Sequence, residues 1–371
     1  MKKILSVLLA LTMVLALAAC GGSSAPAATQ AAAPAATEAA APAATEAAAP
    51  AATEAAAPAA TEAAAPAEDS KIVVGFAQVG HESDWRTANT KNYQDVFSAE
   101  NGYDLVFVDC DNDNAVQIEA VRTSIQQGVD YIILAPIQSA GWESVLQEAK
   151  DAGIPVIVAD RQVDADASMY DAFLGTDTSV EGKLAGDWLA EYLNGAEANI
   201  LVIEGSVGSS AAIGRTNGFN EVAAEHPEWT ILDSQSGDFT QTGGQEVMES
   251  FIKSYNGKFN VVVCQNDNEA YGAMDAMDAA GITYGVDGDV IIISYDATHD
   301  GLKYTLEGKI NCNVECNPIQ AAYVEQIIQQ MEAGEEFATY TLVEDQAFVA
   351  PGIESAYATT MTQEILDGRA Y

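Results

Sequence analysis

From Lys71 onwards, short apolar runs alternate with amphipathic segments, and this alternation constrains the fold more than any other feature. The first group of apolar runs, rich in β-branched residues, lies at 72–77, 105–110, 131–136, 156–160 and 172–176. Helical patterns separate these runs at about 84–100, 114–127 and 142–152. Strands that are covered on both faces are continuous apolar runs, so the alternation predicts βαβ units around a parallel sheet.

The same alternation starts again after a long helical pattern at about 178–193. A second group of strand-like runs lies at 199–205, 230–235, 260–266 and 290–296, with helical patterns near 212–225, 241–255 and 267–280. Two groups of similar size predict two lobes of similar architecture. A further strand at 310–316 precedes a helix at 318–333 that has no partner strand in its own lobe. This leftover helix indicates that the chain crosses back to the first lobe.

The N-terminus has the pattern of an export signal. Lys2 and Lys3 precede an apolar run from Ile4 to Ala19, which is followed by Cys20. The run is too short for a typical membrane span, and small residues that end in a cysteine are typical of a bacterial lipoprotein signal. We therefore expect cleavage of residues 1–19, a lipid on Cys20 and a location outside the cytoplasm, anchored to the membrane. An ordinary secretory signal with a chance cysteine is the alternative.

Residues 20–70 are predicted to be a spacer. From about 25 to 67 the chain repeats APAATEAA, which places a proline at every eighth residue. Proline interrupts each helix that the alanines favour, and no residue in the repeat is large enough to form a core. The segment is therefore expected to be a semi-extended tether between the lipidated cysteine and the folded part.

Charge and cysteine usage exclude several classes of function. The formal net charge is −40, which argues against nucleic acid and against an anionic membrane surface as partners. The four cysteines after Cys20 lie in or beside apolar runs and are expected to be buried free thiols; they are Cys110, Cys264, Cys312 and Cys316. The three histidines show no ligand spacing to any cysteine, so we expect no metal site and no cofactor.

The arginines point to a cleft. Open parallel sheets bind ligands beyond the carboxyl ends of their strands. The chain has only five arginines, and three of them, Arg86, Arg161 and Arg215, fall at or just beyond such ends. Guanidinium groups supply several donors in a fixed plane, which suits multidentate recognition of a ligand. The alternative for Arg161 and Arg215 is a structural ion pair with a nearby carboxylate.

Further strand-end residues complete a set of donors, acceptors and flat faces. Carboxylates provide acceptors, an amide provides both a donor and an acceptor, and aromatic rings provide apolar faces. The candidates are Glu82, Asp160, Asp296 and Glu315, then Asn266, then Trp85, Phe239 and Tyr295. Planar polar groups beside aromatic faces suit a sugar, whose ring has hydroxyl edges and C–H faces. The sequence therefore predicts a sugar-binding cleft.

Several segments carry a family resemblance. They are VGFAQVGHESDWR (74–86), the stretch 130–161 that ends in an Asp-Arg pair, EGKLAGDWL (181–189), the stretch 234–253 that contains QSGDF, and QND (265–267). With these segments the chain resembles the type I periplasmic sugar-binding proteins of ABC transporters, and in particular the galactofuranose-binding ones. The resemblance implies an α/β fold of two doubly wound, Rossmann-like lobes joined by a three-crossing hinge. The expected lobes are 71–175 plus 316–350 and 176–315 plus 351–371.

The resemblance also implies roles for the candidate residues. Glu82, Trp85 and Arg86 match contacts that follow the first strand, and Asp160 with Arg161 matches a clamp on paired hydroxyls. The remaining matches come from the second lobe and the hinge: Arg215, Phe239, Asn266, Asp296 and Glu315, with Tyr295 as a stacking aromatic ring. Glu315 replaces the glutamine of ribose binders, which counts against the same pentopyranose as ligand. Asp84 replaces a small residue of similar proteins, and this replacement is expected to alter the sugar preference. The implied partners are a monosaccharide, a permease and an ATPase, and the protein is expected to be a monomer.

Other functions are weighed against this one. An exported glycosidase would use Asp160 with Asp296 or Glu315 as its carboxylates, but the adjacent Arg161 would hold such a carboxylate ionised and occupied. A sugar-responsive regulator of the same fold is disfavoured, because no helix-turn-helix pattern precedes residue 71 and the chain starts like a lipoprotein. Binding of another small sugar, or of a signalling ligand for a chemoreceptor, stays open. The expectation is a binding protein and no enzyme.

Overall fold

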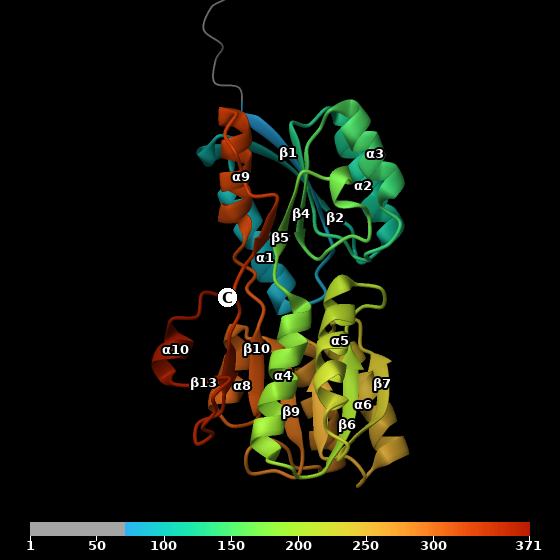
Figure 1. Cartoon of the computed structure of the whole chain (residues 1–371), viewed down its shortest axis with the longest axis vertical. Coiled ribbons are helices and arrows are strands. Elements are labelled where there is room, and N and C mark those ends of the chain that lie inside the picture. The colour runs from blue at the N-terminus through green and yellow to red at the C-terminus, as the bar shows by residue number, and fades with distance from the viewer. Residues whose placement is uncertain (1–70) are drawn as a thin grey trace, which may run out of the picture. The chain divides into compact units, whose positions relative to one another are not determined.

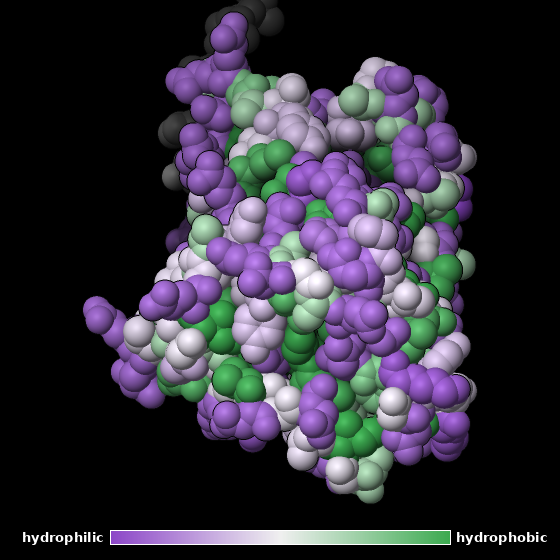
Figure 2. All heavy atoms as spheres, turned by 60° about the horizontal axis from the view of Figure 1, so that its bottom comes forward, coloured by the Kyte–Doolittle hydropathy of each residue, from purple (hydrophilic) through white to green (hydrophobic). Residues whose placement is uncertain are grey.

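The computed structural model describes residues 71–371. The predicted signal peptide at 1–19, the lipidation of Cys20 and the spacer at 20–70 lie outside the described residues. Among residues 71–371, no helix combines the length and the apolar character that a membrane crossing requires. Figure 2 shows hydrophilic residues spread over the face that it presents, with hydrophobic residues in small separate patches.

A parallel sheet forms the centre of the first lobe (Figure 1). Its strands, in spatial order, are β11 (Tyr340–Leu342), β5 (Ala172–Gly175), β4 (Val156–Asp160), β3 (Tyr131–Leu134), β1 (Ile72–Gln78) and β2 (Tyr103–Asp109). The helices that cover it are α1 (Asp84–Val96) packed beside α9 (Ala321–Ala333), and α2 (Asn114–Gln127) packed beside α3 (Glu143–Ala152). Side chains of α9 belong to the same buried core as β1 and β3, so the leftover helix does return to the first lobe.

The second lobe repeats this architecture. Its strands, in spatial order, are β13 (Thr359–Thr360), β12 (Ala347–Val349), β10 (Cys312–Glu315), β9 (Ile291–Asp296), β8 (Val261–Cys264), β6 (Ala198–Glu204) and β7 (Trp229–Ser236). The helices are α4 (Thr178–Leu193) with α5 (Ser210–Ala223), α6 (Gln241–Tyr255) with α7 (Asp267–Ala280), and α8 (His299–Leu306) with α10 (Gln363–Asp367). The first two pairs cover opposite faces, because their buried side chains belong to two separate cores.

Three segments connect the two sheets. The chain passes from β5 to α4, from β10 to α9, and from β11 to β12. The predicted fold class, two doubly wound lobes joined by a three-crossing hinge, is therefore confirmed. Both sheets order their parallel strands so that the carboxyl ends of the strands face the junction between the lobes (Figure 1).

One predicted boundary is wrong. The first lobe was expected to continue to residue 350, but β12 pairs antiparallel with β10 in the second sheet, with Val349 opposite Cys312. The third crossing therefore ends before Ala347. The four residues between the two strands, Val343 to Gln346, are mostly polar, and this short polar stretch was not distinguishable from a loop within one lobe.

The thiols are buried as expected. Among the described residues, Cys110, Cys264, Cys312 and Cys316 are all free and all buried. Cys316 lies in the second crossing, where its thiol is 3.5 Å from the hydroxyl of Thr176 at the first crossing. This contact joins two of the three hinge segments.

Candidate functional site

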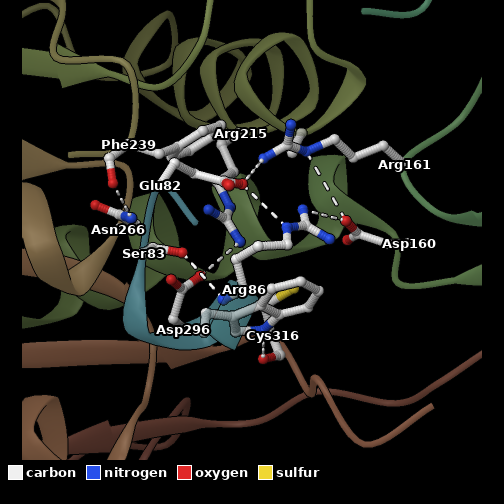
Figure 3. A pocket seen from close by; sticks show the side chains of 12 residues that line it. Glu82, Ser83, Arg86, Asp160, Arg161, Arg215, Phe239, Asn266, Asp296 and Cys316 are labelled. Carbon is white, nitrogen blue, oxygen red and sulfur yellow. Dashed lines mark hydrogen bonds and ion pairs between the residues drawn. The ribbon is translucent and has the colours of Figure 1, made fainter. Parts of the chain in front are cut away.

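One cavity lies between the carboxyl ends of the two sheets (Figure 3). Residues of both lobes line it, so a ligand bound there would touch the two lobes at once. Its lining residues are Glu82, Ser83, Trp85, Arg86, Asp160, Arg161, Ala211, Arg215, Phe239, Asn266, Asp296 and Cys316. Nine of the eleven candidate residues from the sequence are in this set, and Arg161 and Arg215 converge on the same cavity from different lobes.

The start of α1 positions the residues that follow the first strand. Ser83 caps this helix by accepting a hydrogen bond from the backbone N–H of Arg86 at 3.1 Å. The cap fixes the first helical turn, on which Trp85 and Arg86 are neighbours. The indole Nε1 of Trp85 donates to the carbonyl oxygen of Cys316 at 2.6 Å, so the hinge holds the ring in place.

In Arg86, each side-chain nitrogen donates to another part of the protein. Its Nε donates to Glu82 Oε1 at 3.0 Å and its Nη2 donates to Asp160 Oδ2 at 2.6 Å. Its Nη1 donates to Gln78 Oε1 at 3.2 Å. Arg86 is only 1 % exposed. A buried guanidinium with this many partners is part of the scaffold of the site, since removal of the arginine would leave two buried carboxylates without their main partner.

Arg161 is used differently. Its Nη2 donates to Glu82 Oε1 at 3.1 Å, but its Nη1 is buried and has no hydrogen-bond partner. The second oxygen of Glu82, Oε2, is also buried and also lacks a partner. A buried polar atom without a partner is unfavourable. The cavity therefore contains one unused donor and one unused acceptor, on two side chains that already bond each other.

Arg215 supplies the corresponding group from the second lobe. Its Nε donates to Glu181 Oε2 at 2.7 Å, its Nη2 donates to Asp296 Oδ1 at 3.3 Å, and its Nη1 bonds the carbonyl oxygen of Gln265. The planes of Arg161 and Arg215 both lie near the ring of Phe239, at 5.0 and 6.0 Å from its centroid. The aromatic ring therefore lies near a guanidinium group from each lobe.

Three of the residues that line the cavity have an unusual backbone conformation with a positive φ. Asp160, Phe239 and Asp296 have φ values of 66°, 60° and 94°, a region that residues other than glycine adopt rarely. Such strain is common at binding sites, where surrounding structure imposes it. Gly205 makes room for one of them, because a Cβ atom at that position would lie 1.9 Å from the ring carbon Cζ of Phe239.

Asn266 borders the cavity but is already bonded within the protein. Its side-chain oxygen caps α7 by accepting from the backbone N–H of Glu269 at 2.8 Å, and its Nδ2 donates to the carbonyl oxygen of Phe239 at 2.8 Å. The side chain therefore joins the loop that carries Phe239 to the start of α7. Across residues 71–371, no cluster of three or more potential metal ligands occurs.

The charges of the cavity nearly cancel. Burial raises the pKa of Glu82, but Arg86 and Arg161 lower it by a larger amount, so the pKa falls below its ordinary value. Burial raises the pKa of Asp296 to about 8, although Arg215 opposes the shift. Asp296 is therefore largely protonated near neutral pH. Each of the three guanidiniums is paired with buried carboxyl groups: Arg86 with Glu82 and Asp160, Arg161 with Glu82, and Arg215 with Glu181 and Asp296. This pairing favours a neutral ligand.

The prediction that Tyr295 stacks in the cleft is wrong. Tyr295 is fully buried and belongs to the core between the second sheet and helices α4 and α5. Successive strand residues point to opposite faces, and Ile293 and Tyr295 share the inner face while Asp296 continues into the cavity. The ring supports Arg215 from behind, with 4.9 Å between the guanidinium and the ring centroid.

The predicted role of Glu315 is wrong as well. Its carboxylate is not in the cavity lining, because it bonds Arg369 and accepts from the Tyr371 hydroxyl at 2.8 Å. Three lining residues were not among the candidates: Ser83, Ala211 and Cys316. Ser83 had a detectable signal, since a serine before a helical pattern is a typical N-cap. Ala211 and Cys316 carry no chemical signal of their own.

The sequence matches the periplasmic binding protein domain over residues 72–333. The chain belongs to this family. As a periplasmic binding protein it has the type I fold of the family, which the sequence predicted, and the family functions outside the cytoplasm.

Several known periplasmic binding proteins are similar to this one. The galactofuranose-binding protein YtfQ of Escherichia coli is 43% identical over 253 residues, which is 67% of this chain and 79% of the relative. The fructose import binding protein FruE of Bifidobacterium longum is 30% identical over 78% of this chain and 88% of its own length. A crystal structure from Mycobacterium smegmatis in complex with β-D-fucofuranose is 43% identical and covers 75% of this chain and 91% of that one, with a TM-score of 0.72.

A second similar structure is the arabinose-transporter binding protein from Shewanella, bound to α- and β-L-arabinofuranose. It is 38% identical, covers 75% of this chain and 91% of that chain, and has a TM-score of 0.71. By their names, two of these relatives serve sugar import or transport, and both similar structures contain a five-membered sugar ring.

Proposed function

We propose that this protein captures a neutral monosaccharide in its furanose form, of the galactofuranose class, and delivers it to an ABC transporter. The observation that supports this proposal most directly is that two buried polar atoms of the cavity, Arg161 Nη1 and Glu82 Oε2, have no hydrogen-bond partner. One is a donor and the other an acceptor. Vicinal hydroxyl groups of a sugar would satisfy both, because each hydroxyl can donate and accept.

The charges of the cavity support the same ligand class. Its guanidiniums are already paired with carboxylates, which disfavours a sugar acid or a sugar phosphate as the ligand. Phe239 offers an aromatic face to the C–H side of a ring. The furanose form is supported by the relatives that bind galactofuranose, fucofuranose and arabinofuranose by their names.

The transport role rests on the family. A substrate-binding protein encloses its sugar between the lobes by hinge motion, and the three crossings provide such a hinge. The closed protein would then dock, as a monomer, on a permease driven by an ATPase. We include in the proposal the lipid anchor on Cys20, which would keep the folded lobes near that permease.

Calorimetric titration tests the ligand class. Galactose, fucose and arabinose, whose solutions contain furanose forms, should bind, whereas galacturonic acid and galactose 6-phosphate should not. Binding of the acids with equal or higher affinity would contradict the charge argument. The same titrations with a galactofuranose-containing disaccharide test for an enzyme, because sustained release of free sugar would end the binding-protein proposal.

The anchor is tested separately. Cys20→Ser should move the exported protein from the membrane fraction to the soluble fraction, without a change in sugar affinity. A serine variant that stays in the membrane fraction would contradict lipidation of Cys20 and leave the proposal for the cavity untouched.

A further inference from the structure

The two lobes contact each other directly at a place outside the sugar cavity. The backbone N–H of Asp84 donates to Asn268 Oδ1 at 3.0 Å, and Asn268 Nδ2 donates to Asp84 Oδ2 at 3.2 Å. Asp84 is the first residue of α1 in the first lobe, and Asn268 is the second residue of α7 in the second lobe. Neither residue lines the cavity. We call these two residues the Asp84–Asn268 pair.

The pair satisfies two helix starts at once. The first N–H groups of an α-helix have no partner within the helix, and Asn268 supplies one for the start of α1 across the lobe boundary. In return, the carboxylate of Asp84 lies beside the start of α7, where the partial positive charge of a helix N-terminus favours an anion. Both bonds exist only while the lobes are together, because the residues belong to different lobes.

The pair is local and separable from the sugar-binding network. Asp84 is exposed, and Asn268 has an exposed fraction of only 9 %. The hydrogen bonds of the pair do not include Glu82, Arg86 or Arg161. Other hydrogen bonds also cross between the lobes. The backbone N–H of Ser139 donates to the carbonyl oxygen of Gly208, and the backbone N–H of Gln162 donates to the hydroxyl of Ser210. Within residues 71–371, only the Asp84–Asn268 contact joins the lobes by reciprocal hydrogen bonds that involve side chains.

We infer that the Asp84–Asn268 pair is a positioning device that stabilises the closed form of the protein and thereby slows the release of sugar. An interaction that exists only in the closed form lowers the free energy of that form alone. Loss of the pair therefore accelerates dissociation and leaves the sugar contacts unchanged. This part of the inference rests on the proposed function, whereas the effect on closure without a ligand does not.

An exchange of the two side chains provides the sharpest test. Asn268→Asp places a second carboxylate against Asp84, which opposes closure by repulsion. Combining it with Asp84→Asn restores one amide and one carboxylate in reversed positions. We expect about three- to thirtyfold faster sugar dissociation for Asn268→Asp and recovery to near the wild-type rate in the exchanged double variant. Glu143→Gln is the matched control, because Glu143 is an exposed acid in the first turn of α3, a helix of the first lobe that is not part of the Asp84–Asn268 pair.

Closure without sugar is measured as a distance between spin labels. Val116→Cys and Thr242→Cys place labels on exposed positions in the first turns of α2 and α6, one in each lobe. The native cysteines of the described part are buried, and the protein without the two new cysteines is the labelling control. Longer distances in Asn268→Asp and their return in the exchanged variant support the inference. Identical distances in all variants would overturn it.

Stopped-flow measurement with galactose supplies the second readout. A faster dissociation rate at unchanged melting temperature in Asn268→Asp supports a positioning role, whereas equal dissociation rates in all variants overturn it. If the wild-type protein binds no sugar, the proposed function fails, and the label distances still decide whether the pair closes the lobes.

Discussion

The two buried arginines that follow the first and fourth strands should respond differently to the same substitution. Arg86 has protein partners for each of its nitrogen atoms, whereas Arg161 has one unused nitrogen that faces the cavity. Replacement by methionine removes the guanidinium and keeps most of the stem. We expect Arg86→Met to damage the fold and Arg161→Met to damage mainly ligand binding.

The magnitudes follow from the contacts. Arg86→Met leaves Glu82 and Asp160 buried without their main partner, which costs about 3–5 kcal/mol and lowers the melting temperature by roughly 5–15 °C. Arg161→Met removes a 3.1 Å bond to Glu82 and a longer 3.9 Å ion pair with Asp160, from a group whose pKa is lowered by burial and by Arg86. Its free energy of unfolding should therefore fall by about 1.5–3 kcal/mol, which is less than the loss for Arg86→Met.

Binding should show the opposite order of effects. One charge-assisted hydrogen bond to a sugar hydroxyl contributes about 1.5–3 kcal/mol, so Arg161→Met should weaken galactose binding about 10- to 150-fold. Thermal unfolding and calorimetric titration of both variants decide the matter. An Arg161→Met protein that loses as much stability as Arg86→Met, with unchanged affinity, would refute the reasoning and make Arg161 a structural residue.

Three further predictions concern the walls of the cavity and the hinge. Burial raises the pKa of Asp296 from 3.8 to about 8. The contribution of Asp296 to the stability of the fold is therefore present at acid pH and is lost as the pH rises through about 8. In a profile of melting temperature between about pH 4 and 9, Asp296→Asn should remove this loss and flatten the curve. Gly205→Ala should displace the Phe239 ring, lower the free energy of unfolding by about 1–3 kcal/mol in denaturant unfolding, and weaken sugar binding. Adding Phe239→Ala to this variant should restore stability but not sugar affinity. Arg369→Ala should cost about 3–5 kcal/mol of unfolding free energy, because it leaves the buried Glu315 without its cation, and Glu315→Gln in the same chain should recover part of the loss.

Each of these three has a contradicting outcome. A wild-type and an Asp296→Asn profile of the same shape would mean that Asp296 is ionised in the folded protein at neutral pH. Full stability of Gly205→Ala would show that the Phe239 ring has another position available. Wild-type stability of Arg369→Ala would show that Glu315 has sufficient solvent access to stay charged without Arg369.

Most of the fold was predictable because its signals are local. Apolar runs and helical periodicity specify strands and helices wherever both sheet faces are covered, and the leftover helix at 318–333 implied the return to the first lobe. The boundary at 350 was not predictable in the same way. β12 has only three residues, and its pairing with β10 depends on tertiary contacts. No local sequence pattern indicates which of the two sheets this strand joins.

The candidate site shows the same division. Residues just beyond strand ends converge by topology alone, which is why Arg161 and Arg215 were found from the sequence. Tyr295 was misplaced because the reversal of the backbone at Asp296, with its φ of 94°, decides which of the two side chains enters the cavity. Glu315 was misplaced because its partner Arg369 is distant in the sequence, and such a pairing becomes visible only in the folded chain.

The central claim is that the cavity selects a neutral sugar with a five-membered ring. The most direct measurement is the ¹³C NMR spectrum of galactose labelled at its anomeric carbon and bound to the protein. Furanose and pyranose forms have separate anomeric signals, so the spectrum identifies the ring form that is bound. We predict a bound furanose signal although pyranose dominates in free solution, and a bound pyranose signal, or none at saturating galactose, would contradict the account.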